Sequence, residues 1–201
     1  MMRLSLFLLI IAPLYSCNSQ SSNDVEYKKF EDLGTGWTTT YPFSFRVMTQ
    51  EEIDKLEGRG QKALESTIDA KLELLHKNLL WLKKDQFNSF TSNSQAFDTI
   101  ADGSYEDSQE IIYQTLEEAY RSHGIPFDVK YGKTKIDNLE FSTMETTVYT
   151  PDRKNILMTQ ILYDRLINGV ISLTLNVNYN NEKDKAALLG IISSTKLSKR
   201  N

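Results

Sequence analysis

The stretch that decides the fold lies near the C-terminal end, where residues 156–179 read ILMTQILYDRLINGVISLTLNVNY. In its second half, apolar residues occupy every other position from 171 to 179, which is the side-chain period of a β-strand with one face on a core. Asn168-Gly169 divides the stretch, and this pair favours a tight hairpin turn because both residues tolerate positive φ. We therefore predict two antiparallel strands, over residues 156–167 and 170–179.

Similar patterns extend outward from this hairpin. A helix is predicted after it, with Ala186, Leu189 and Ile192 on its buried face. Because consecutive strands join through tight turns and helices are interspersed among them, we expect an α+β fold: an antiparallel β-sheet flanked by about three helices. The other predicted strands cover residues 37–47, 79–83, 87–97, 128–136 and 139–150, and the predicted helices begin near residues 50, 107 and 182.

The ends of two helices have recognisable chemistry. Thr49 and Glu52 have the spacing of a capping box, which predicts that the first helix begins there. Gly58 and Gly60 weaken this helix and leave open whether it is one piece or two. His123-Gly124 predicts the end of the second helix.

Three features of this order point to one known layout. They are the aromatic strand Tyr41-Pro42-Phe43-Ser44-Phe45, the helix in the middle of the chain, and the strand, Asn-Gly turn, strand and helix of residues 156–195. Together they resemble the α-β-α layout of the PsbP-like superfamily over residues 37–197. That superfamily contains the extrinsic photosystem subunit, a nuclear-import factor that binds a small GTPase, and many bacterial lipoproteins. Its members share no active site, so the resemblance implies a fold and carries over no functional residue.

The first 16 residues have the composition of an export signal. Arg3 gives a positive start, and the apolar run over residues 4–14 is too short for a membrane span of about 20 residues. Leu14-Tyr15-Ser16-Cys17 resembles the lipobox of bacterial lipoproteins, from which Tyr15 departs. The resemblance implies a lipoprotein signal peptide over residues 1–16, with Cys17 as the lipidated N-terminus of the mature chain.

A lipid on Cys17 would make the membrane the first partner of this protein, because two or more acyl chains give stable anchoring. The polar residues that follow predict a flexible tether over residues 17–36, before a single domain over residues 37–201. Asn18 stands where lipoproteins retained at the inner membrane have aspartate, so the resemblance implies the outer membrane. The alternatives are a conventional signal peptide with an incidental cysteine, and a buried N-terminal helix.

Residue types that carry catalysis or bind metals are scarce. His76 and His123 are the two histidines, and with one cysteine they form no zinc motif, so we interpret both as structural. No G-x-S-x-G or P-loop occurs, and Gly34-Thr35-Gly36 lacks the third glycine of a nucleotide-binding turn. We assign no catalytic, metal-binding or cofactor-binding residue, and we expect no cofactor.

One acidic segment, residues 98–110, has two interpretations. Its oxygen ligands resemble a calcium loop, but Ile100 and Gln109 occupy positions where the EF-hand spacing needs ligands. The interpretation that we favour is a turn at Asp102-Gly103 followed by a helix cap at Ser104.

The composition limits the function. A pI near 5.3 and a net charge of −4 argue against nonspecific binding to nucleic acid, which needs many basic side chains. We therefore expect a non-enzymatic accessory lipoprotein of the cell envelope that binds a protein partner. Two alternatives stay open: a carrier of a small molecule or lipid, which needs a deep apolar pocket, and a hydrolase with an unrecognised site. Alternating aromatic residues are interpreted as core rather than as a ligand platform: Trp37, Tyr41, Phe43, Phe45, Trp81, Phe87 and Phe90.

Overall fold

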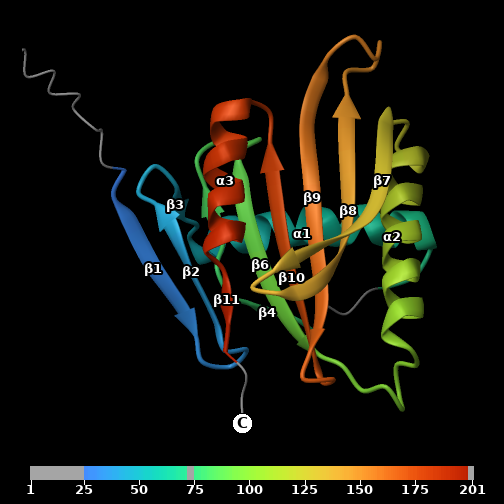
Figure 1. The fold of residues 1–201 in the computed structure, drawn as a ribbon. Coiled ribbons are helices and arrows are strands. Elements are labelled where there is room, and N and C mark those ends of the chain that lie inside the picture. Colours follow the sequence, from blue (N-terminus) through green and yellow to red (C-terminus); the bar gives the residue numbers. More distant parts are fainter. Residues whose placement is uncertain (1–24, 72–74, 199–201) are drawn as a thin grey trace, which may run out of the picture.

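The computed structural model describes residues 25–71 and 75–198, so the expected signal peptide and Cys17 lie outside the described residues. The described helices are α1 (Gln50–Ile68), α2 (Tyr105–Ser122) and α3 (Glu182–Ser194). The described strands, shown with the helices in Figure 1, are β1 (Tyr27–Asp32), β2 (Trp37–Pro42), β3 (Arg46–Val47), β4 (Lys77–Asn78), β5 (Leu82–Lys83), β6 (Ser89–Ala96), β7 (Phe127–Ile136), β8 (Leu139–Tyr149), β9 (Ile156–Ile167), β10 (Ile171–Tyr179) and β11 (Lys196–Leu197).

Most of the strands form one central antiparallel sheet, with the order β3-β5-β6-β10-β9-β8-β7 and with β4 paired to β6. The strands β7 to β10 are neighbours in the sequence and in the sheet, as the tight turns predicted. Asn168 and Gly169 connect β9 to β10 with φ values of 52° and 72°, the positive values that an Asn-Gly turn needs. The expected α+β fold with an antiparallel sheet and three helices is confirmed.

A second, three-stranded sheet has the order β1-β2-β11. Its outer strand corrects the prediction that residues 17–36 form a tether, because residues 27–32 pair with β2 along their whole length. The physical reason is Phe30, whose ring lies 5.1 Å from the buried ring of Trp37. The folded domain therefore begins before residue 37.

Two of the predicted strands are interrupted. The strand expected over residues 37–47 is divided, because β2 ends at Pro42 and the short β3 joins the central sheet. The strand expected over residues 79–83 is interrupted where the Ser92 hydroxyl accepts from the Leu80 N–H at 2.9 Å and donates to its carbonyl at 3.0 Å. This side chain replaces the backbone partner that a regular strand would use.

The helix starts were predicted well. Thr49 caps α1 with the complete capping box, and the helix runs unbroken through Gly58 and Gly60 as one piece. Ser104 caps α2 by accepting from the Asp107 N–H at 3.1 Å, which confirms the cap interpretation of the acidic segment. In the part of the chain that the structure describes, no helix has the length and apolar composition to cross a membrane.

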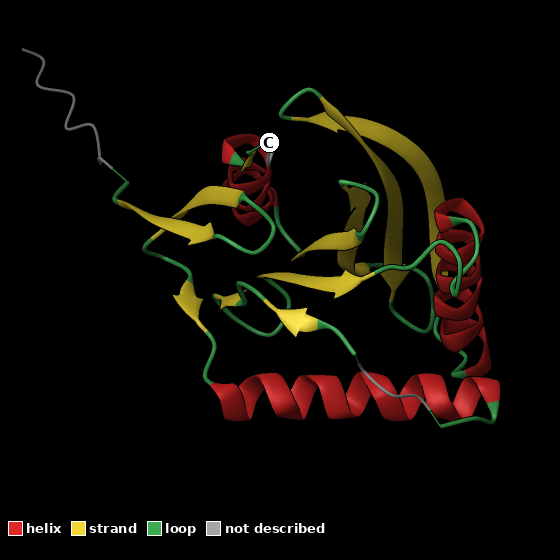
Figure 2. Cartoon of the chain, turned by 90° about the horizontal axis from the view of Figure 1, so that it is seen from below, coloured by secondary structure: helices red, strands yellow, loops and turns green. Residues whose placement is uncertain are grey.

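Helices lie on both sides of the central sheet. Figure 2 shows α3 and the small sheet on one side, with α1 on the opposite side and α2 at the end of the sheet that carries β7 to β9. Because side chains alternate along a strand, β10 presents Leu173, Leu175 and Val177 to the α3 side and Thr174 and Asn176 to the other. The two faces therefore have different chemistry.

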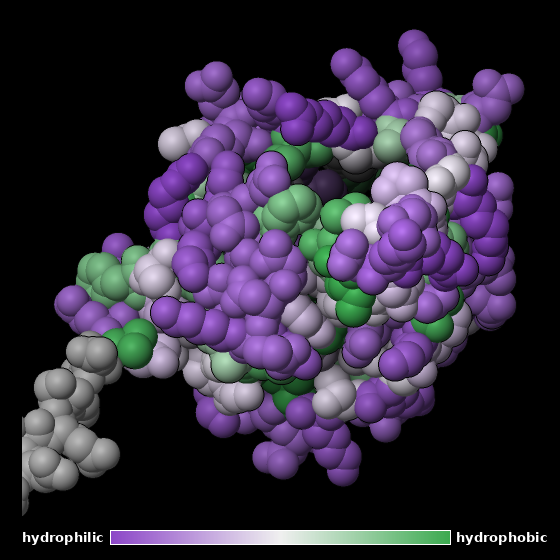
Figure 3. All heavy atoms as spheres, turned by 90° about the horizontal axis from the view of Figure 1, so that it is seen from above, coloured by the Kyte–Doolittle hydropathy of each residue, from purple (hydrophilic) through white to green (hydrophobic). Residues whose placement is uncertain are grey.

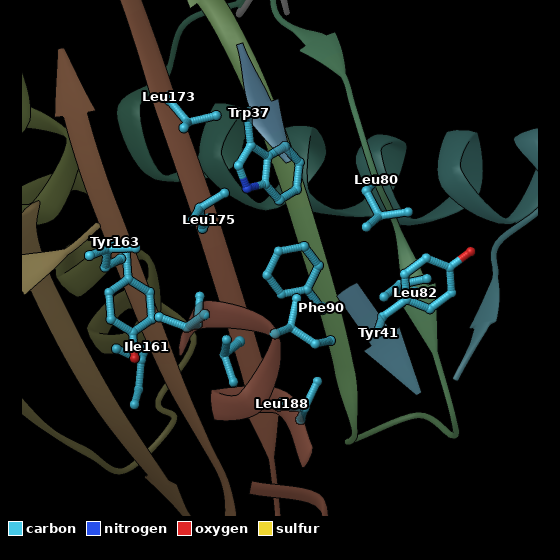
Figure 4. Packing of buried hydrophobic residues seen from close by; sticks show 14 of the residues in the cluster. Trp37, Tyr41, Leu80, Leu82, Phe90, Ile161, Tyr163, Leu173, Leu175 and Leu188 are labelled. Atoms are coloured by element: carbon cyan, nitrogen blue, oxygen red, sulfur yellow. The ribbon is translucent and has the colours of Figure 1, made fainter. Parts of the chain in front are cut away.

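The apolar core lies between the central sheet, α3 and the small sheet (Figure 4). Trp37, Phe90, Leu175 and Leu188 come from four different elements and are each fully buried there. The indole N–H of Trp37 donates to the Thr195 hydroxyl at 3.2 Å, so the one polar group of that ring is satisfied. Viewed from above, the surface is mostly hydrophilic, with hydrophobic residues in small groups around a hollow (Figure 3).

Candidate functional site

A groove of about 710 Å³ lies between α2 and the strands β7, β8 and β9. Its volume lies in the range of about 300–1,000 Å³ that is usual for ligand sites. We call it the α2 groove, and its helical wall is formed by Tyr105, Glu106, Gln109, Glu110, Tyr113 and Gln114.

The helical period of α2 places three of these side chains over the sheet. Tyr105, Gln109 and Tyr113 are spaced by four residues, which puts them on one face of the helix. The hydroxyl of Tyr105 lies 3.4 Å from that of Ser172 on β10. The hydroxyl of Tyr113 donates to Asp164 on β9 at 2.9 Å, so α2 is held to the sheet partly by polar contacts.

Asp164 is the charged centre of the α2 groove, and only 5% of its surface is exposed. It also accepts from the Thr174 hydroxyl at 2.6 Å, across the register of β9 and β10. Burial raises the pKa of the Asp164 carboxyl to about 6, although the bonds from Thr174 and Tyr113 oppose that shift. A carboxylate has about four accepting sites, so two donors leave part of its capacity unused.

Gln109 is the second buried polar side chain in the wall of the α2 groove. It is 7% exposed, and its Oε1 has no hydrogen-bond partner among the described residues. An amide oxygen buried without a donor costs about 1–3 kcal/mol. Three more buried amide oxygens, on Asn78, Asn176 and Asn178, share this condition.

The rim of the α2 groove carries charges that are already paired. Lys133 on β7 contacts Glu140 on β8 at 2.8 Å. Arg165 donates to the carbonyl of Glu140 and lies over the ring of Phe141, 5.9 Å from its centre. The side chains of Lys133 and Arg165 are therefore already bound to neighbouring residues. Asp164 and Gln109, by contrast, keep unused hydrogen-bond acceptors inside the α2 groove.

Tyr131 adds an aromatic surface from the edge strand β7. Its ring stacks on that of Tyr113 with the centres 5.6 Å apart and the planes inclined by 22°. Its hydroxyl donates to Glu117 of α2, whose carboxylate also binds Arg121 at 2.5 Å. The hydroxyls of Tyr113 and Tyr131 thus donate their hydrogens to carboxylates. Their oxygen lone pairs remain to accept hydrogen bonds from a ligand in the groove.

The residues singled out in the sequence lie mostly elsewhere. His76 contacts Glu57 at 2.8 Å, and the ring of His123 contacts the Ala119 carbonyl at 2.8 Å at the end of α2, as the structural interpretation predicted. Trp37, Tyr41, Phe45 and Phe90 are core residues, whereas Phe43 is exposed. The proposed lipidation site, Cys17, is outside the described residues.

Sequence reasoning missed the centre of the α2 groove. One signal could have indicated it: Asp164 and Arg165 interrupt the apolar residues at the end of a central strand, and a buried charge there needs a reason. Among the described residues, no group of three or more His, Cys, Asp or Glu side chains is arranged to hold a metal ion. The arrangement can accept hydrogen bonds from a ligand and contact it with aromatic rings.

Comparison with known proteins places the fold. No protein-family model and no curated protein matches the chain. The solution structure of cyanobacterial PsbP (CyanoP) from Synechocystis is similar, with a TM-score of 0.56 and 11% identity over 93% of this chain and 100% of that one. At this identity the likeness shows the fold alone, and it confirms the expected PsbP-like layout.

Two further structures are more distant. A Bacteroides thetaiotaomicron protein has a TM-score of 0.45 and 11% identity, with 86% of this chain and 48% of that one covered. The Saccharomyces cerevisiae Ran-binding protein Mog1p has a TM-score of 0.40 and 10% identity, with 86% of this chain and 96% of that one covered.

Proposed function

We propose that this chain is a non-enzymatic binding protein of the bacterial cell envelope, anchored by a lipid on Cys17, which holds a protein partner in the α2 groove. The observation that carries the proposal is the pair of buried acceptors, Asp164 and Gln109 Oε1, in the wall of one open groove. Burying such groups costs stability unless they are paired. A bound partner that donates hydrogen bonds would offset that cost.

The two alternative functions fit the groove less well. A lipid carrier needs an apolar cavity, whereas charged and polar side chains such as Asp164, Glu110 and Lys133 line this one. A serine hydrolase needs its triad at the binding site, and neither histidine lines the groove: His76 contacts Glu57, and His123 contacts Ser122 and the Ala119 carbonyl at the end of α2. A small polar ligand is the stronger second candidate, because the volume of about 710 Å³ suits one.

The anchor and the groove make separate contributions to this role. The lipid on Cys17 would confine the domain to the membrane surface, and the groove would select the partner. Replacement of Cys17 by serine should abolish labelling with radioactive palmitate and release the protein from membranes. Continued labelling of that variant would contradict the anchoring.

Site-specific photocrosslinking in intact cells tests the groove. A photoreactive amino acid at Gln114, an exposed residue of the groove wall, should give one dominant crosslinked envelope protein. The matched control is Lys183, an exposed residue of α3 on the other side of the sheet, and it should not give that product. Equal products from both positions, or none from either, would contradict a partner in the groove.

A further inference from the structure

The polar groups inside the α2 groove are mostly acceptors. Asp164 receives two donors and retains accepting sites, and Gln109 Oε1 receives none among the described residues. The hydroxyls of Tyr113 and Tyr131 are donated to Asp164 and Glu117, so their oxygen lone pairs remain for a ligand. A ligand that fits this lining has to bring hydrogen-bond donors.

The net charge of the groove lining also favours a ligand that brings hydrogen-bond donors, because it is negative. Acidic side chains outnumber basic ones by three, since the acids are Glu106, Glu110, Glu117, Glu140 and Asp164 and the bases are Lys133 and Arg165. Both bases are already engaged with Glu140, through its carboxylate and its carbonyl. Glu117 is paired with Arg121 outside the lining, so among the described residues the uncompensated negative charge lies at Glu106 and Glu110 of α2 and at the buried Asp164.

Aromatic rings complete the site. Tyr105, Tyr113 and Tyr131 contribute to the lining from α2 and β7. The face of an aromatic ring attracts a cation within about 6 Å of its centre. Tyrosines beside a buried carboxylate suit the apolar stem and the charged end of an alkylamine.

We infer that the α2 groove takes an organic cation with several N–H donors, a primary ammonium or guanidinium group on a short alkyl stem, with its charged end at Asp164 and Gln109. The inference rests on the proposed binding role of the groove and names the chemistry that the groove recognises. The cation has two sources: a free amine, or a lysine or arginine side chain of a partner.

Binding of such a cation should depend on pH, because the pKa of Asp164 is about 6 in the empty groove. A bound positive charge favours the ionised carboxylate, so affinity should fall about tenfold for each pH unit below that pKa. The charged groups around Asp164 are Glu106, Glu110 and Glu117 of α2, Lys133 of β7, Glu140 of β8 and Arg165 of β9. Two tyrosines, Tyr105 and Tyr113, also face it, and burial raises the pKa of each above its usual range.

Isothermal titration of the lipid-free mature chain with three probes tests the inference. Cadaverine represents a free amine, Nα-acetyl-lysine N-methylamide represents a lysine side chain, and glutarate is the anionic control of matched length. We expect saturable binding of at least one cation at about pH 8 and a weaker interaction at about pH 5. Binding of both cations would point to a side chain of a partner, and binding of cadaverine alone to a free amine.

Two variants locate the binding. Asp164→Asn keeps an acceptor for Tyr113 but removes the charge, and it should weaken cadaverine binding at least about tenfold. Glu145→Gln is the matched control, because Glu145 belongs to β8 but interacts with Tyr163 and Tyr179 on the α3 side. It should leave the affinity unchanged. If Asp164→Asn does not fold, Gln109→Leu provides the same test from the helix.

The outcomes separate this inference from the proposed function. The inferred preference for a cation would be contradicted if glutarate bound more tightly than either cation. It would also be contradicted if the Asp164 and Glu145 variants lost the same amount of cation affinity. If no cation binds but the Gln114 crosslink captures a partner, the inference fails and the binding role stands. If cadaverine binds and no protein crosslinks, the inference stands and the proposal of a protein partner is contradicted.

Discussion

The two faces of the central sheet are made by the same strands but have different chemistry. On the α3 side, Leu173, Leu175 and Val177 of β10 are fully buried against an apolar cluster. On the opposite side, the same strand presents Thr174 and Asn176. The first face contributes the hydrophobic stabilisation of the domain, whereas the second keeps polar groups that a partner can use.

The difference indicates a division between stability and function. The α3 face satisfies its polar atoms, as the Trp37 indole does with Thr195. The α1 and α2 face retains acceptors that have no partner in residues 25–71 and 75–198, among them the amide oxygens of Gln109 and Asn176, and a carboxylate with a raised pKa, Asp164. Functional sites commonly retain polar groups that lower stability, because replacing those groups would remove the activity.

The largest expected effect is on the apolar face. Phe90→Ala removes a fully buried ring that lies 6.0 Å from that of Trp37, and it should lower the free energy of unfolding by about 3–5 kcal/mol. Urea denaturation followed by circular dichroism measures the change. A loss below about 1 kcal/mol would mean that this face is not the main source of stability.

Removal of the buried charge should instead raise the free energy of unfolding. The pKa of Asp164 is about 6 in the folded chain against the ordinary 3.8, so the folded state binds the proton more tightly and loses stability as the pH rises from about 4 to 6. Asp164→Asn does not titrate and should therefore gain up to about 3 kcal/mol over the original chain by pH 8, and nothing below about pH 4. Denaturation curves of both chains across this pH range measure the difference. Glu145→Gln is the control, and a constant difference at all pH values would contradict the assignment.

A smaller gain is expected at a buried amide oxygen that has no hydrogen-bond partner among the described residues. Asn176→Leu replaces a buried acceptor, whose amide donates weakly to Thr91 at 3.3 Å, with an apolar side chain of similar size. The change should be neutral or should stabilise the domain by about 1 kcal/mol. The melting temperature measures it. A loss of several degrees would show that the polar face is satisfied in solution, for example by an ordered water.

Small losses of stability are expected at the helix caps. Ser104→Ala removes one hydrogen bond, to the Asp107 N–H, and should cost about 1 kcal/mol. Asn181→Ala should cost more, about 2 kcal/mol, because Asn181 caps α3 and also donates to Asp184 at 2.9 Å. Thermal denaturation of the two variants compares them. A larger loss for Ser104→Ala than for Asn181→Ala would mean that the cap of α2 contributes more stability than the cap of α3.

Much of the fold could be predicted because its signals are local. Asn168-Gly169, the capping box at Thr49 and the cap at Ser104 each involve residues within a few positions of one another. The boundaries that failed depend on distant partners. Phe30 joins the domain through Trp37, and the Ser92 hydroxyl interrupts the strand at Leu80 from twelve residues away.

The candidate site was less predictable than the fold. Tyr113 and Asp164 are separated by 51 residues, and no pattern in either segment indicates that they share a hydrogen bond. Period 2 along β9 assigns Asp164 to the face opposite Tyr163, but it does not say which helix covers that face.

By itself, the sequence determined the alternation of the strands, the turns and the helix starts, because backbone preferences and short-range hydrogen bonds act between neighbours. It also carries the lipobox-like segment that ends at Cys17, on which the anchoring proposal depends. Only the tertiary structure decided that α2 lies over β7 to β9, and that it encloses Asp164 and Gln109 in one groove. The physical reason is that burial, and the pKa that it raises, depend on which surfaces pack together across the sheet.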